Sequence, residues 1–89
     1  MILPTGKTVR ITSCNPNRCY LLIQNIDTTN TNYIYLMQEQ AEAEVMLAQG
    51  VVIGGTGFIE MQNCNNMQSK KEWFAYTEVS GMDIRVKDV

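Results

Sequence analysis

Short stretches of the chain alternate between apolar and polar residues, which is the pattern of a strand with one buried face. The clearest stretches are residues 8–12, 72–79 and 82–89. In the last of them, Met82, Ile84 and Val86 would point inward while charged residues alternate with them. We therefore predict one strand in each stretch.

Residues 18–24 form a nearly continuous apolar run instead. In an extended conformation, one face would carry Cys19, Leu21 and Ile23, and the other Tyr20 and Leu22. A strand that is buried on both faces has this composition, so we predict a central position in a sheet. The preceding Asn15-Pro16-Asn17 segment favours a turn, because proline fixes φ and asparagine side chains bond to nearby backbone.

Polar segments separate these stretches from three further short strands, which we expect at residues 33–37, 51–53 and 58–61. Residues 25–32 are predicted to form the turn of a hairpin. The GGTG sequence at 54–57 is predicted to form another, with glycines at positive φ. About seven short strands in one 89-residue chain indicate a single domain over residues 1–89. The expected fold class is all-β, as a small antiparallel sandwich or barrel.

Residues 38–50 interrupt the strand pattern with strong helix formers such as Ala, Glu, Gln, Leu and Met. Gly50 lies where a helix C-cap is expected. We predict a short helical turn within residues 39–49, which would need packing to be stable.

The chain carries 7 basic and 9 acidic residues and no long run of either sign. This balance disfavours a nucleic-acid partner, whose binding surface is strongly basic. The adjacent pair Lys70-Lys71 is interpreted as a solvated loop. No apolar run is long enough to cross a membrane, so no membrane partner is expected. The first residues do not have the pattern of a signal peptide, and synthesis in a cytoplasm would keep the cysteines reduced.

The three cysteines, Cys14, Cys19 and Cys64, leave several interpretations open. They could hold zinc with a carboxylate or water, although the paired spacing of a structural zinc site is missing. Cys14 and Cys19 could instead form a disulfide across the turn. The simplest interpretation makes Cys19 a small core residue and the other two turn or loop residues.

No residue pattern indicates catalysis. The absence of histidine removes the commonest general base and nitrogen ligand. Scattered acids, which include Glu39, Glu42, Glu44, Glu72 and Glu78, are interpreted as solvated. The GGTG sequence lacks the Lys-Ser/Thr pair of a phosphate-binding loop. We therefore predict no catalytic residue, no cofactor and no metal, and a chain that is not an enzyme.

Seven aromatic residues are the other candidate binding groups: Tyr20, Tyr33, Tyr35, Phe58, Trp73, Phe74 and Tyr76. They could stack bases or sugars. Since several lie on opposite faces of their strands, we expect most of them in the core or in an oligomer interface.

Five segments in order, "NPNRCYLLIQN", "TNYIYL", "GVVIGGTGFIEM", "WFAY" and "DIRVKDV", resemble small virion proteins of tailed bacteriophages. The resemblance spans roughly residues 8–86 and rests on short structural motifs. It departs at "EQAEAEVMLAQ", where such proteins carry Gly/Ser/Thr-rich loops. The resemblance implies a β-sandwich module that acts as a capsid decoration, head-fibre or tail accessory protein and assembles as a symmetric oligomer.

The resulting expectation is a virion structural protein, specifically a capsid decoration (cement) protein that binds the outer shell as a homo-oligomer. Its partners would be the major capsid protein or other virion proteins, and its location the virion. The alternative is a tail or head-fibre module that binds a host surface or a glycan.

Overall fold

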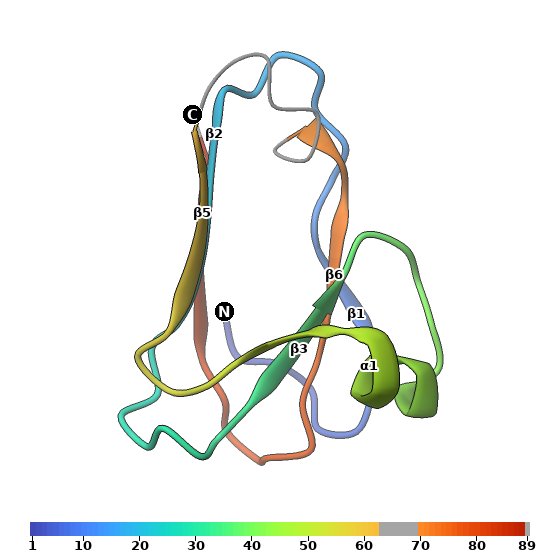
Figure 1. Cartoon of the computed structure of the whole chain (residues 1–89), viewed down its shortest axis with the longest axis vertical. Helices are drawn as coiled ribbons and strands as arrows, with labels where there is room; N and C mark the ends of the chain where they lie inside the picture. Colours follow the sequence, from blue (N-terminus) through green and yellow to red (C-terminus); the bar gives the residue numbers. More distant parts are fainter. Residues whose placement is uncertain (63–69, 89) are drawn as a thin grey trace.

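The computed structural model describes residues 1–62 and 70–88, and in these residues seven strands form two antiparallel sheets that face each other (Figure 1). One sheet has the order β1 (Val9–Thr12), β6 (Trp73–Tyr76), β3 (Ile34–Met37) and β4 (Val51–Ile53). The other has the order β5 (Phe58–Gln62), β2 (Tyr20–Asn25) and β7 (Ile84–Asp88). A short helix, α1 (Ala43–Gln49), connects β3 to β4. The predicted all-β sandwich is confirmed.

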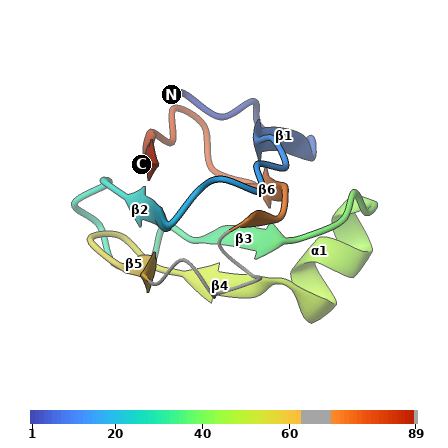
Figure 2. The ribbon, with the colours of Figure 1, turned by 90° about the horizontal axis from the view of Figure 1, so that it is seen from above.

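The chain changes sheet at every connection between successive strands except the one from β3 to β4 (Figure 2). The two hairpins predicted at residues 25–32 and 54–57 are therefore wrong: β2 and β3 lie in different sheets, and so do β4 and β5. Both segments are arches between layers. Turn-forming residues serve an arch as well as a hairpin, and the partner of a strand is decided by packing across the whole domain.

The core lies between the sheets and is built from the inward residues of almost every strand. Its buried members include Ile11, Leu21, Ile23, Ile34, Leu36, Ile53, Trp73, Ala75, Met82 and Ile84. The central position predicted for the strand at residues 18–24 is confirmed by β2, although the strand begins at Tyr20. Its predicted burial on both faces is wrong. Leu21 and Ile23 are fully buried, whereas Leu22 on the opposite face is half-buried, because no described element covers that face.

Helix α1 packs on the outer face of the four-stranded sheet at β3, and so covers part of that face (Figure 2). Phe74 and Tyr76 alternate with the core residues of β6, yet both are buried on this second face, and Met46 of α1 is fully buried. The predicted helical segment at 39–49 is confirmed over the shorter range of α1. Gly50 ends the helix at φ −67°, so a left-handed conformation is not the reason for glycine. A Cβ atom there would lie 2.5 Å from the Met46 carbonyl oxygen.

The N-terminal residues pair with the beginning of β7 through a short antiparallel β-bridge between Ile2 and Asp83. The Leu3 amide donates to the Met82 carbonyl at 2.8 Å, and the Ile84 amide donates to the Met1 carbonyl at 2.9 Å. The terminal ammonium also bonds the Asp83 carboxylate at 2.9 Å. These contacts cover part of an edge that would otherwise be unpaired.

Candidate interaction surfaces

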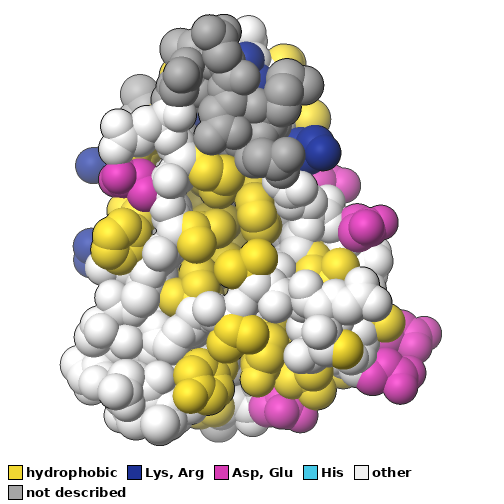
Figure 3. All heavy atoms as spheres, in the orientation of Figure 1, with side chains coloured by type: hydrophobic (Ala, Val, Ile, Leu, Met, Phe, Trp, Pro, Cys, Tyr) yellow, Lys and Arg dark blue, Asp and Glu magenta, His cyan; other side chains and the backbone are white. Residues whose placement is uncertain are grey.

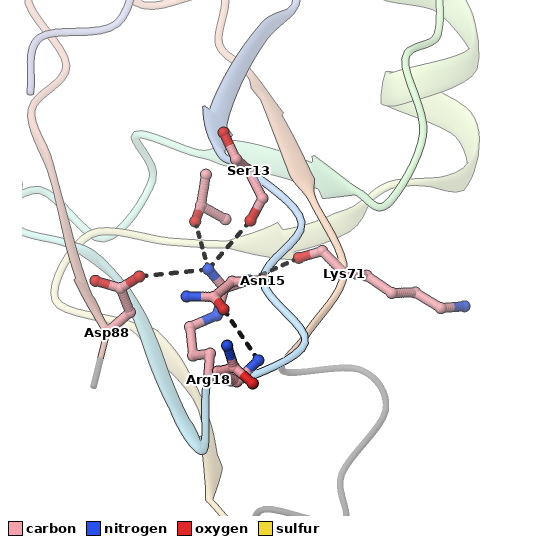
Figure 4. Close-up of polar contacts among 7 residues, drawn as sticks. Ser13, Asn15, Arg18, Lys71 and Asp88 are labelled. Carbon is pink, nitrogen blue, oxygen red and sulfur yellow. Dashed lines mark hydrogen bonds and ion pairs between the residues drawn. The ribbon is translucent and has the colours of Figure 1, made fainter.

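Arg18, at the start of the apolar run, is a buried structural cation (Figure 4). One guanidinium nitrogen donates to the Thr12 hydroxyl at 3.0 Å, the Ser13 carbonyl at 3.1 Å and the Asp88 carboxylate at 3.3 Å. The other nitrogen donates to the Lys71 carbonyl at 2.9 Å. Arg18 therefore joins the end of β1, the end of β7 and the segment before β6 at one end of the sandwich.

Asn25 has the corresponding structural role at the opposite end of β2. Its buried side-chain amide donates to the carbonyls of Asn32 at 2.9 Å and Ile53 at 3.1 Å, and its amide oxygen accepts from the Asp27 backbone at 3.1 Å. Both polar ends of the predicted strand segment are thus used to hold the fold. Neither presents a free group to a substrate.

The first two glycines of the GGTG turn are required by close packing against the neighbouring arch. A Cβ atom at Gly55 would lie 2.2 Å from the Thr29 carbonyl oxygen, and one at Gly54 would lie 2.5 Å from the Asn30 carbonyl oxygen. The predicted positive φ at the glycines is wrong: in this turn it occurs at Thr56, at 67°. Close contact between the β4–β5 arch and the β2–β3 arch therefore explains the glycines at 54 and 55.

Cys14 and Cys19 do not form the cross-turn disulfide that their spacing left open. Cys14 is an exposed free thiol, whereas Cys19 is disulfide-bonded. The expectation that Cys19 is a reduced core residue is therefore wrong, since spacing along the chain does not reveal which thiols the fold brings together. Cys64 lies outside the described residues. Within residues 1–62 and 70–88, no group of three cysteine and carboxylate side chains is placed to hold a metal ion.

The acids considered for catalysis are dispersed in the structure. Glu39, Glu42, Glu44 and Glu78 are exposed. The half-buried Glu72 lies 3.7 Å from Arg10, as an ion pair on the sheet surface. These positions give no pair of carboxylates across a cleft of the kind that glycoside hydrolysis uses.

Three of the seven aromatic residues are buried and stabilise the fold. Trp73 lies in the core, and Phe74 and Tyr76 are buried on the other side of β6. The exposed aromatic residues are Tyr33, with 41% of its surface accessible, and Phe58, with 58%. Strand β6 therefore offers no stacking platform for bases or sugars.

One side of the sandwich exposes apolar residues along two strand edges, on both faces of β4 and on the core face of β5. We call it the open side and define it by Val51 and Val52 of β4 and Ile59 and Met61 of β5. The valines are 48% and 51% exposed, and Ile59 and Met61 are half-buried against the core. Strands β4 and β5 are edges of their sheets and lie on the same side of the molecule (Figure 2). Apolar side chains gather along the middle of this side (Figure 3).

The outer face of the three-stranded sheet is a second exposed surface, which we call the bare face. Strand registers place its outward residues in cross-strand rows: Phe58, Gln24 and Arg85 in one, Glu60, Leu22 and Lys87 in the next, and Gln62 beside Tyr20. An acid therefore lies on β5 and two bases on β7, with a half-buried leucine between them. The sequence reasoning missed this arrangement. Alternation along β5 and β7 can indicate which residues point outward. It does not indicate that both strands pair with β2.

Glu60 is held in a fixed position on the bare face. The Tyr20 hydroxyl donates to its carboxylate at 2.7 Å, and the Gln62 amide donates to its other oxygen at 2.6 Å. These two hydrogen bonds, with Tyr20 first, lower the pKa of Glu60. The hydrogen bond to Glu60 in turn raises the pKa of Tyr20, because it stabilises the phenol over the phenolate.

In the described part of the chain, no helix has both the length and the apolar character needed to cross a bilayer. No protein-family model, curated protein or solved structure matches the chain.

Proposed function

We propose that the chain is a bacteriophage virion structural protein, specifically a capsid decoration protein that binds the outer shell and has no catalytic activity. The motif series in the sequence supports the virion setting. The observation that supports a binding role most directly is the open side, with two exposed valines on an edge strand. A large exposed apolar surface on a small domain is a common mark of a protein partner.

The other edge strands carry charged side chains, which discourage pairing, whereas β4 is protected only by its length of three residues. Arg10 lies on the edge strand β1, Glu60 on β5, and Arg85 and Lys87 on β7, whose beginning is also covered by the N-terminal residues. Strand β4 consists of Val51, Val52 and Ile53. An uncharged apolar edge is a site where another strand or apolar surface can add.

A decoration role suits a module with a modest contact surface. Copies that bind at every equivalent position of a symmetric shell, and that are linked to each other, convert weak single contacts into high avidity. In this proposal the open side binds the shell protein and excludes water from the two valines, while a separate surface joins neighbouring copies.

Cosedimentation with purified capsid shells that lack the chain tests the proposal. We expect saturable binding at micromolar concentration, and loss of that binding in the double variant Val51→Lys/Val52→Lys. Ile2→Lys is the matched control, because Ile2 is 63% exposed and pairs with Asp83, away from β4 and β5. No binding of the unaltered chain would contradict the decoration role. Equal loss in both variants would contradict the assignment to the open side.

The alternative, a tail or head-fibre module that binds a glycan, is favoured by the positions of the exposed aromatic residues. Tyr33 lies at the end of the β2–β3 arch and contacts the region of Gly54, while Phe58 follows the GGTG turn. Exposed rings near loops are suited to stacking on sugars. A glycan array would detect this function, and Tyr33→Ala should then abolish the signal without affecting shell binding.

A further inference from the structure

The bare face carries opposite charges on its two edges and apolar groups along its middle. Glu60 lies on β5, Lys87 lies in the same row on β7, and Leu22 separates them. In the next row, Phe58 on β5 and Arg85 on β7 flank Gln24. The pattern is therefore asymmetric across the strands: acid and aromatic on one edge, bases on the other.

We propose that the bare face binds the bare face of a second copy of the chain, around a two-fold axis that runs along the direction of β2. The partner is identified by charge complementarity, because the face contains both members of each pair. This inference does not depend on the open side, and it names the surface that would join neighbouring copies in the proposed decoration role.

The direction of the axis follows from the charges. A two-fold axis parallel to β2, between two stacked sheets, brings β5 of each copy over β7 of the other. Glu60 then meets Lys87 twice, and Phe58 lies over Arg85 twice, an arrangement in which a guanidinium can stack on an aromatic ring. Leu22 and Tyr20 meet their own counterparts at the centre. An axis perpendicular to the strands would instead place Glu60 on Glu60, which like-charge repulsion disfavours.

The charged groups of the bare face are available for such pairing. The ion pairs found among the described residues involve Met1, Arg10 and Arg18, and none of them includes Glu60 or Lys87. Arg85 makes only a long hydrogen bond, 3.4 Å, to Gln24 in its own row. The bonds from Tyr20 and Gln62 fix the orientation of the Glu60 carboxylate before the partner arrives. Such preorganisation reduces the entropy lost on association.

The size of the face sets the expected affinity. Three strands with about 4.8 Å spacing and five residues with about 3.4 Å rise cover roughly 14 Å by 17 Å. A standard stable interface removes about 800 Å² of accessible surface from each partner. The bare face is smaller, so we expect a weak dimer in solution, whose affinity decreases as salt screens the charge pairs.

Sedimentation velocity over a concentration series tests the inference, with charge reversal as the perturbation. We expect a reversible dimer for the unaltered chain. Glu60→Lys alone and Lys87→Glu alone should each weaken it at least about tenfold, since each variant places like charges opposite each other twice. The combined variant Glu60→Lys/Lys87→Glu restores opposite charges and should recover the affinity to within about threefold.

Matched controls separate this effect from net charge and from loss of folding. Glu44→Lys on α1 and Lys7→Glu near the N-terminus make the same charge changes at exposed positions away from the bare face, and should leave dimerisation unchanged. Circular dichroism should show the same fold for every variant. A chain that stays monomeric at millimolar concentration would overturn the inference. A dimer that survives both single reversals but dissociates with Val51→Lys/Val52→Lys would also overturn it, whereas shell binding reports on the proposed function separately.

Discussion

The Arg18 guanidinium lies 3.3 Å from the Asp88 carboxylate, yet only 2% of the Arg18 side chain is exposed while 49% of the Asp88 side chain is. Removing Asp88 and removing Arg18 should therefore break different numbers of hydrogen bonds. Without Asp88, Arg18 keeps its bonds to Thr12, Ser13 and Lys71. Without Arg18, two carbonyls and a hydroxyl lose their donor.

We predict that Arg18→Met lowers the free energy of unfolding by about 2–4 kcal/mol, because three partly buried acceptors lose their donor at once. Asp88→Asn should cost less than about 1 kcal/mol, since its carboxylate is half in solvent and such pairs contribute little. Urea unfolding followed by tryptophan fluorescence measures both, with Trp73 as the probe. Equal effects of the two substitutions would show that the ion pair, and not the carbonyl contacts, is the important interaction.

Asn25→Asp should produce a pH-dependent loss of stability. The new carboxylate would be buried beside the Asn32 and Ile53 carbonyl oxygens, which now accept hydrogen bonds from the amide. Burial and these oxygens would raise its folded-state pKa above the unfolded value. The folded state would then hold the proton more tightly, so the loss grows as pH increases from about 4, the pKa of an ordinary aspartate. We expect at least about 2 kcal/mol at pH 7.

Unfolding of Asn25→Asp at pH 4 and pH 7, each relative to the unaltered chain, measures this dependence. Asn30→Asp makes the same chemical change at an exposed position and is the control. A destabilisation that is the same at both pH values would argue that the new group stays solvated.

The pKa of Tyr20 should decrease toward its ordinary value in Glu60→Gln. The hydrogen bond to the carboxylate is the main cause of the raised pKa, and a neutral amide is a weaker acceptor without charge repulsion toward the phenolate. Carbon-13 NMR titration of the tyrosine rings measures the change. Glu78→Gln is a useful comparison: it should lower the pKa of Tyr76 only in part, because burial is the larger cause there, and should leave Tyr20 unaffected.

The GGTG turn gives two neighbouring substitutions with opposite expected effects. Gly55→Ala should destabilise the chain by about 2 kcal/mol or more, because the added carbon overlaps the Thr29 carbonyl. Thr56→Gly should be neutral or stabilising by up to about 1 kcal/mol, since glycine removes the cost of positive φ at this position. The greater entropy of glycine in the unfolded chain offsets part of this gain. Thermal unfolding of both variants measures the contrast. A destabilising Thr56→Gly would mean that the threonine side chain makes a stabilising contact.

The sequence was sufficient to predict the strands and their class, because alternation and turn residues act locally. It placed Ile84 in the core and the helix before Gly50 correctly. It did not reveal which strands pair, and the same limit applies to the contacts of Arg18. Arg18 begins the apolar run in the sequence, but its partners come from residues 12–13, 71 and 88, which only the fold brings together.

The candidate surfaces could be predicted only in part for the same reason. Val51 and Val52 were identified as a short strand, but their exposure depends on β4 being an edge. Glu60 was placed within a short strand, and Lys87 among the outward charged residues of another. Their arrangement around Leu22 required the order β5, β2, β7, which sequence patterns do not encode.

The exchange of sheets at nearly every connection has a consequence for how the chain folds. Neither sheet contains a run of neighbouring strands that could pair early as a local unit, apart from β3 and β4 around α1. The strands of every other pair are separated along the chain by at least one strand of the opposite sheet, so a long loop must close before they can pair. Domains dominated by such distant pairings fold in milliseconds to seconds and without stable halves. We therefore expect one cooperative, comparatively slow folding step, and no autonomous fragment from a cut in any of the arches.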